Sequence, residues 1–169
     1  MAILSGIDRL LLFRIEGDTS QNAWKVPYQT EHDFSESRDF ETTETKDGSV
    51  SSAGAYEGTI SLTALAKQGG ETIQQLKEVL RERSPRKVEV WEIETVDVDE
   101  ETTIPGEYMV CNLTDLSSSA PTDGNVEITL DFTVEGRPQV GDVNVTPQLL
   151  AIVQQASDEQ EFVQPMGEA

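Results

Sequence analysis

The residues that could take part in catalysis are few, and their spacing does not suit it. His32 lies next to Asp33 and close to Ser35, so a base, an acid and a hydroxyl occur in one short stretch. Neighbouring residues of an extended strand point to opposite faces, which keeps these three side chains from forming a hydrogen-bonded triad. We therefore interpret His32 as a surface histidine and predict that the chain is not an enzyme.

The single cysteine also argues against covalent catalysis. Cys111 lies within an apolar segment, where burial would raise the pKa of its thiol and make it inert. One cysteine has no partner for an internal disulfide or a C-x-x-C motif. The sequence contains no phosphate-binding glycine motif and no G-x-S-x-G element. We expect no cofactor.

An acidic run between Glu92 and Glu101 is the one candidate for a metal site. It contains a D-x-D-x-E spacing but lacks the central glycine and the distal glutamate that a calcium loop needs. We interpret the run as a solvated acidic loop, with weak cation binding as the alternative, and predict no metal site.

The charge of the chain restricts its partners. The 169 residues carry 32 acidic and 12 basic side chains, a net charge of -20 at pH 7, which repels nucleic acids and anionic membranes. The apolar run from Leu10 to Phe13 is too short for a signal peptide or a membrane span. The sequence therefore predicts a cytosolic protein that neither enters membranes nor binds nucleic acid specifically.

Hydrophobic alternation predicts a mainly β fold. Between Asn125 and Glu135, apolar side chains alternate with polar ones, as they do in a strand with one buried face. Residues 71–83 show the helical spacing of apolar residues instead. The strand expected over residues 87–96 changes its apolar phase near Trp91, which indicates a bulge.

The segment from Ser35 to Thr45 has β-favouring residues but hardly any apolar face, since Phe40 stands alone among charged neighbours. Its backbone groups must find their partners in another strand or in water. A turn at Lys46, Asp47 and Gly48 follows, and the small residues of 51–55 indicate a mobile loop. We expect a long polar hairpin loop over about residues 34–58.

After Gly136 the composition changes to that of an arm. We divide the chain into a β domain, residues 1–136, and a C-terminal arm, residues 137–169, in which Thr146 and Pro147 begin a short helix. A helix this short must dock on something, either its own domain or a neighbouring copy. Its expected docking residues are Leu149, Leu150, Ile152 and Val153.

The order of these segments resembles the major tail tube proteins of bacteriophages with long, non-contractile tails. The resemblance covers roughly Asp8 to Val153. It depends on Tyr28-Gln29-Thr30-Glu31 before the polar strand, Thr45-Lys46-Asp47-Gly48 at its tip, Val88-Glu89-Val90-Trp91, and the run from Asp123 to Ile128 that opens the final strand.

The resemblance implies a mainly β (α+β) fold, in which two packed antiparallel sheets form a sandwich or barrel-like body flanked by one α-helix. It also implies hexameric rings that stack into a tube around a tape-measure protein, with tail initiator and terminator proteins as further partners. The location implied is the virion tail, with the host cytoplasm as the place of assembly. DNA would pass through the tube without specific binding.

The same resemblance suggests roles for individual residues. We expect Glu36, Glu41 and Glu44 to face the lumen, because their strand has no apolar face. Phe40, Lys46, Asp47 and Gly48 would form a loop between subunits. Two alternatives remain: a tube-terminating tail protein, and an acidic decoy that mimics DNA and binds a host DNA-binding protein.

Overall fold

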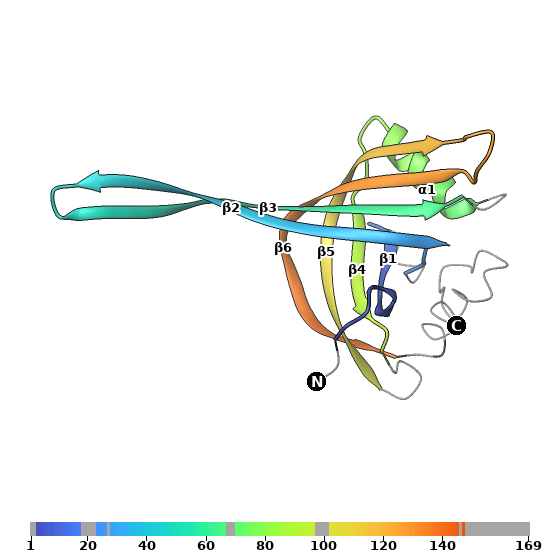
Figure 1. Cartoon of the computed structure of the whole chain (residues 1–169), viewed down its shortest axis with the longest axis horizontal. Coiled ribbons are helices and arrows are strands. Elements are labelled where there is room, and N and C mark those ends of the chain that lie inside the picture. The colour runs from blue at the N-terminus through green and yellow to red at the C-terminus, as the bar shows by residue number, and fades with distance from the viewer. Residues whose placement is uncertain are drawn as a thin grey trace.

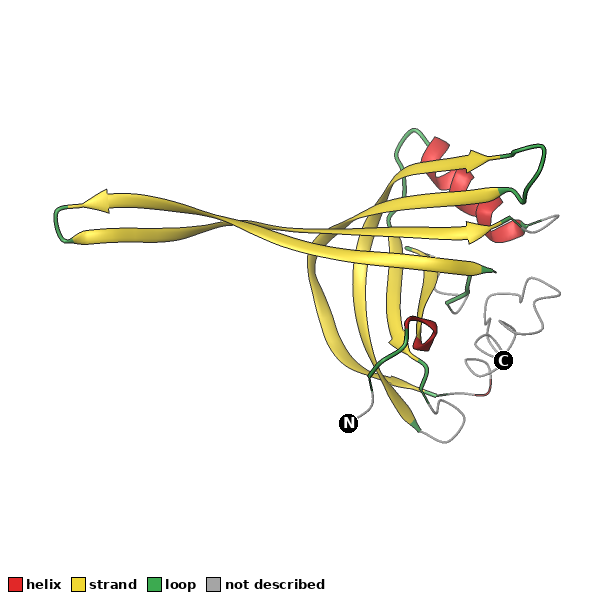
Figure 2. Cartoon of the chain, viewed as in Figure 1, coloured by secondary structure: helices red, strands yellow, loops and turns green. Residues whose placement is uncertain are grey.

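The computed structural model describes residues 3–17, 23–26, 28–66, 70–96, 102–145 and 147. These residues form a mainly β molecule with one α-helix, as the sequence predicts (Figures 1 and 2). In chain order the elements are the 3-10 turn η1 (Gly6–Asp8), β1 (Arg9–Ile15), β2 (Gln29–Thr45), β3 (Gly48–Leu65), α1 (Glu71–Arg81), β4 (Val88–Glu94), β5 (Thr103–Ser119) and β6 (Glu127–Asn144).

The six strands form one antiparallel sheet in the order β1-β4-β5-β6-β3-β2. This differs from the expected pair of packed sheets. The long strands β5 and β6 are strongly bent, so the single sheet curves back on itself and encloses a core (Figure 1). Register shifts between Tyr108 and Val110 and between Leu113 and Asp115 mark the bends of β5, and Gly136 adopts φ +78° in β6. Bulges and such glycines increase local twist and curvature.

The core lies inside this bend. Phe13 of β1 stacks on Phe132 of β6 with ring centroids 5.5 Å apart. Two strands separate β1 from β6 in the sheet, a distance of about 14 Å if the sheet were flat. The contact therefore requires the curvature. Leu76 and Val79 of α1 cover the same core, and the alternating residues Ile128, Leu130, Phe132 and Val134 supply its β6 side.

A smaller apolar cluster covers the opposite face of β4. Leu12, Ile93 and Ile104 form it, while Val88 and Val90 on the other face belong to the main core. Both faces of β4 are thus buried, which explains the change of apolar phase at Trp91. The predicted bulge is wrong, because β4 keeps a regular register with β5 from Val88 to Ile93.

Several predicted segments have other boundaries. The helix expected over 71–83 is present as Glu71–Arg81. Residues 51–55, expected in a mobile loop, belong to β3 and pair with β2. Residues 137–144, expected as the start of the arm, are the second half of β6 and pair with β5. Residues 148–169, which include the expected docking helix, lie outside the described residues.

The hairpin of β2 and β3 projects from the body as a two-stranded ribbon (Figures 1 and 2). β3 pairs with β6 only over Gly58–Leu65, so residues 37–57, which we call the ribbon, pair only with each other. At about 3.3 Å per residue the ribbon extends roughly 27 Å. Apart from the half-buried Tyr56, its residues are exposed.

No helix in the described part of the chain has the length and apolar character that crossing a membrane requires.

The core and the ribbon should respond very differently to the loss of a phenyl ring. Phe132→Ala removes the partner of Phe13 from a site that is 1% exposed, and we expect the free energy of unfolding to fall by about 3–5 kcal/mol. The matched change Phe40→Ala, at a ribbon site 66% exposed, should change it by less than about 0.5 kcal/mol. Urea unfolding of the monomer measures both. Equal losses would contradict this division of the molecule.

Candidate functional site

Four adjacent strands present a polar outer surface. β2, β3, β6 and β5 lie next to one another, and side chains alternate between the buried core and this outer side. The outward residues are acidic, hydroxyl-bearing or amide side chains. We call them the polar face: Glu31, Asp33, Ser35, Thr59, Ser61, Thr63, Thr129, Asp131, Thr133, Asn112, Asp115 and Ser117.

The strand register arranges the polar face in rows. One row crosses all four strands through Asp33, Ser61, Asp131 and Asp115, each opposite the next. Asp131 and Asp115 thus face each other directly, and like charges so placed are destabilising in a sheet. The polar face contains no Lys, Arg or His. At its border the Lys87 ammonium pairs with Glu135 of β6, whose other carboxylate oxygen accepts from the Asn112 amide at 3.3 Å. The face therefore presents an excess of negative charge and hydroxyl groups.

The same four strands end in two free edges. β2 is the last strand of the sheet, and β3 is the only strand of the described residues that pairs with it. At the other margin, β4 pairs with β5 only over Gly106–Cys111, so Asn112–Ser119 of β5 has β6 on one side and no strand of the described chain on the other. Such edges present unpaired backbone donors and acceptors to other chains.

The three expected lumen carboxylates occupy different environments. Glu36 lies near the body and accepts a hydrogen bond of 2.6 Å from the Tyr56 hydroxyl. Burial and this hydrogen bond raise the pKa of Tyr56. Glu41 and Glu44 are exposed on the ribbon, where Glu44 accepts a hydrogen bond of 3.2 Å from Ser49. Their orientation toward a lumen stays a prediction.

The expected loop between subunits is the tip of the ribbon. Lys46 and Asp47 form the turn, Gly48 adopts φ +122°, and the Asp47 amide donates to the Thr45 hydroxyl at 3.2 Å. Phe40 is exposed on the ribbon opposite Ala53. A contact of these residues with another subunit stays a prediction. Leu149, Leu150, Ile152 and Val153 lie outside the described residues.

The interpretation of His32 as a surface residue is wrong. Its side chain is 10% exposed, and its Nε2 lies 2.8 Å from Oε2 of Glu92 in β4. Arg9 reaches the other oxygen of Glu92 at 3.3 Å. The hydrogen bond to His32 is the main cause that holds the pKa of Glu92 below its ordinary value. Glu92 and Glu94 thus belong to a strand, not to the expected acidic loop, whose residues 97–101 are outside the described chain.

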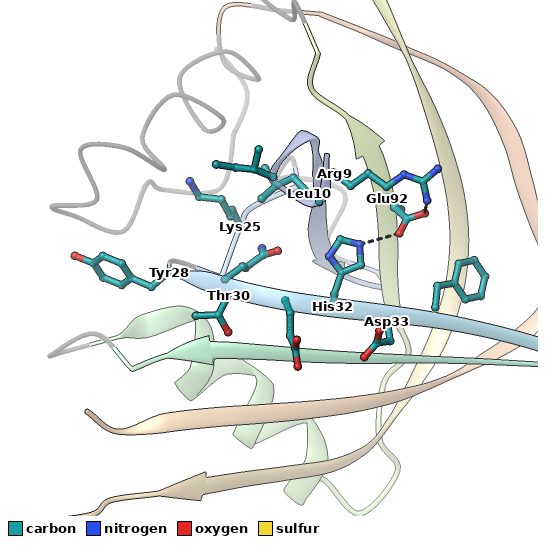
Figure 3. A pocket seen from close by; sticks show the side chains of 13 residues that line it. Arg9, Leu10, Lys25, Tyr28, Thr30, His32, Asp33 and Glu92 are labelled. Carbon is teal, nitrogen blue, oxygen red and sulfur yellow. Dashed lines mark hydrogen bonds and ion pairs between the residues drawn. The ribbon is translucent and has the colours of Figure 1, made fainter. Parts of the chain in front are cut away.

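A seam of side chains joins the two edges of the sheet, β1 and β2. The Gln29 side chain donates to the Leu11 carbonyl at 3.0 Å and accepts from the Leu11 amide at 3.4 Å, as a neighbouring strand would. Together with the His32–Glu92 pair, this contact fixes the start of β2. A pocket of about 690 Å³ lies along the seam (Figure 3). The sequence gives no signal for the seam, because its partners are far apart along the chain.

Lys25 is the unusual member of this pocket. The residue is only 8% exposed, and its Nζ has no hydrogen-bond partner among the described residues. Burial lowers the pKa of Lys25 from 10.5 to about 8, because an ammonium loses its hydration there. Sequence reasoning missed this residue, since its alternation with Trp24 and Val26 indicates a solvent-facing side chain.

The remaining chemical candidates are structural. Cys111 is fully buried, as predicted, and burial raises the pKa of its thiol to about 12. Among the described residues, no group of three or more His, Cys, Asp and Glu side chains is arranged to hold a metal ion. Buried Glu89 is held by Arg14 at 2.7 Å and by the Tyr108 hydroxyl at 2.5 Å.

The described residues thus form a bent sheet with open strand edges, a polar outer face and a projecting ribbon. Residues 3–140 match the family model for phage tail tube proteins, and the chain belongs to that family. The resemblance noted from the sequence is thus confirmed. The protein is a structural component of the virion tail, and the family is not an enzymatic one.

Individual relatives agree with this assignment. A putative tail protein of Staphylococcus phage phiMR25 is 33% identical over 88 residues, which cover 52% of this chain and 44% of that protein. The match thus spans less than half the length of that relative. The solved structure of the SPP1 tail tube has the same fold, with a TM-score of 0.70 and 17% identity over 88% of this chain and 83% of that one.

A second solved structure is the tail of an empty gene transfer agent particle, determined with helical refinement and C6 symmetry. Its TM-score is 0.58 at 12% identity, over 82% of this chain and 99% of that one.

The buried ammonium predicts an unusual dependence of stability on pH. The pKa of Lys25 is about 8 in the folded chain and 10.5 when unfolded, so between these values the unfolded state binds more protons. Its destabilising effect is complete below pH 8 and disappears as the pH rises to 10.5. Lys25→Met should therefore raise the free energy of unfolding by roughly 2–3 kcal/mol at pH 7 and by little at pH 10.5.

Urea unfolding of both proteins at several pH values measures this difference. The comparison between proteins is needed because the raised pKa of Cys111 makes stability fall above pH 9 in both. Lys87→Met is the control, since Lys87 forms an exposed ion pair with Glu135 and its loss should not stabilise the chain. A Lys25→Met protein that is less stable than the parent at pH 7 would refute the prediction.

Proposed function

We propose that six copies of this chain join edge to edge into a ring, in which β2 of one copy pairs with the free edge of β5 in the next. The observation that carries this proposal is the presence of two free edges at opposite margins of one four-stranded band. Contacts between two different edges are heterologous, and they generate a closed ring when the rotation closes. Closure removes the exposed edges and makes one continuous barrel.

The comparison with the gene transfer agent tail supports the number six, because that assembly has C6 symmetry. Rings of this kind stack into the tail tube. The ribbon then reaches an adjacent copy through Phe40, Lys46, Asp47 and Gly48. The C-terminal arm docks on a neighbour. A tape-measure protein inside the tube, and initiator and terminator proteins at its ends, are the further partners we propose.

The polar face lines the bore of this tube. Its carboxylates repel phosphate groups, and the Lys87 ammonium at its border is already paired with Glu135. Glu41 lies beyond the register shift between Arg38 and Phe40 and, in this proposal, extends the lining onto the ribbon. The contribution of Glu36 and Glu44 to the bore stays a prediction. In this arrangement DNA leaves the virion through a conduit to which it does not adhere.

Removal of the ribbon tests its part in assembly. Replacing residues 39–55 by Asn-Gly joins Arg38 to Tyr56, which already face each other, through a two-residue hairpin turn. The monomer should keep its free energy of unfolding within about 1 kcal/mol, because residues 39–55 contribute nothing to the core and Tyr56, which packs against it, is retained. Tubes should be absent from electron micrographs of the concentrated protein.

The control for this deletion is Ser51→Ala combined with Ser52→Ala, which keeps the full length of the ribbon and should assemble like the parent chain. Tubes of normal length from the shortened protein would contradict the proposed role of the ribbon. A parent chain that forms neither rings nor tubes at high concentration and ionic strength would contradict the proposed function as a whole.

Charge reversal tests the lining of the bore. In assembled tubes, Asp33→Lys with Asp131→Lys should increase retention of double-stranded DNA at least about tenfold at low salt, and the gain should disappear as salt rises. Glu71→Lys with Glu78→Lys makes the same charge change on exposed sites of α1. Filter binding at several salt concentrations compares the two. Equal retention by both would show that net charge, not the polar face, governs DNA contact.

A further inference from the structure

Lys25 is a buried cation without a counter-ion among the described residues. The residue is more than nine-tenths buried, lines the pocket along the β1–β2 seam, and its Nζ has no hydrogen-bond partner within the described chain. In Figure 3 it lies at one end of the pocket near Tyr28 and Thr30, away from the His32–Glu92 pair. An unpaired buried charge is costly, so this site favours the arrival of an anion.

The nearby acidic groups do not fulfil that role. Glu92 is already held by His32 at 2.8 Å and by Arg9 at 3.3 Å. Glu31 and Asp33 also line the pocket, but both are exposed residues of the polar face and neither forms a hydrogen bond with the Lys25 ammonium. No carboxylate of the described residues pairs with Lys25, and the net charge of -20 makes another copy of this chain a ready source of carboxylates.

The geometry of β2 indicates which part of a second copy could reach the pocket that contains Lys25. β2 runs from the pocket, at Gln29, to the tip of the ribbon, at Thr45 (Figure 1). These points are about 50 Å apart in an extended strand, so the tip cannot return to its own pocket. The tip and the pocket lie at opposite ends of the same strand. A contact between them is heterologous and repeats from copy to copy.

We propose that the pocket receives the ribbon tip of a second copy in the adjacent ring, where the carboxylate of Glu44 or Asp47 pairs with the Lys25 ammonium. This inference rests on the proposed function and names the contact that joins one ring to the next. The pair forms only on stacking, so the cost of burying Lys25 in the free subunit becomes attraction between rings. Exposed apolar residues at both partners, Ile7 beside the pocket and Phe40 on the ribbon, add apolar contact.

Lys25→Met separates this role from a purely structural one. Loss of the buried charge should raise the Tm of the monomer by about 5 °C, while the concentration needed for tube growth rises at least about tenfold. Sedimentation velocity and electron microscopy measure growth, and calorimetry measures Tm. Lys87→Met is the matched control. It should neither raise the Tm nor raise the concentration needed for tube growth. A stabilised Lys25→Met protein that grows tubes like the parent overturns the inference and leaves the proposed function intact.

Cysteine crosslinking tests the partner directly. In the double variant Lys25→Cys, Asp47→Cys, and in the matching pair with Glu44→Cys, a bridge between tip and pocket can form only between copies. Each copy carries both cysteines, so oxidised tubes of at least one pair should give a ladder of covalent oligomers on a non-reducing gel. The single variants should give dimers at most. Buried Cys111, with its raised pKa, does not compete.

Each outcome has a distinct meaning. Ladders from assembled tubes support the contact. Tubes that yield no ladder in either pair refute it without affecting the ring proposal. A chain ending at residue 145 that assembles poorly, while Lys25→Met has no further effect in it, would identify the acidic C-terminal segment as the partner of Lys25 and overturn the inference. A parent chain that never assembles removes both this inference and the proposed function.

Discussion

Unpaired backbone groups along two strand edges are the main physical constraint on this molecule. Residues 37–57 pair only with each other, and a two-stranded ribbon without an apolar face is at best marginally stable in water. The outer edge of β2 and the edge of Asn112–Ser119 in β5 that faces away from β6 have no strand beside them in the described chain. Since backbone donors and acceptors need partners, the subunit is a complete domain at its core and an incomplete one at its edges.

The body holds these incomplete edges in a defined orientation. The stacking of Phe13 on Phe132 fixes the curvature of the sheet, and α1 closes the core above it. On the side of the sheet where β1 and β2 do not pair, the Gln29 carboxamide joins β2 to β1 and the His32–Glu92 pair joins β2 to β4. The seam thus gives the free edge of β2 a fixed starting point. An edge strand with a loose start would offer many registers to a neighbour, whereas a ring needs one.

Local pattern predicted much of this structure. The alternation from Ile128 to Val134 gave the core face of β6, and the lack of an apolar face from Ser35 to Thr45 indicated the ribbon correctly. What the sequence could not predict depends on contacts between distant residues. His32 and Glu92 are 60 positions apart, and neither has an apolar pattern that signals burial. The single bent sheet was missed for the same reason, because curvature arises where β5 and β6 shift register.

The position of the few basic residues reconciles an acidic subunit with self-assembly. Four basic residues form ion pairs with glutamates of the body: Arg9, Arg14, Arg86 and Lys87. These pairs offset part of the electrostatic repulsion between carboxylates in the folded body. The residues of the polar face pair with none of these basic residues directly, although the Lys87–Glu135 pair borders it at Asn112, and the face keeps its negative charge. Repulsion between exposed carboxylates falls off within about 10 Å at 0.1 M salt, whereas backbone hydrogen bonds at a strand edge act at contact. Edge pairing therefore prevails at short range, and the charge that opposes assembly at a distance remains available on the surface that repels DNA.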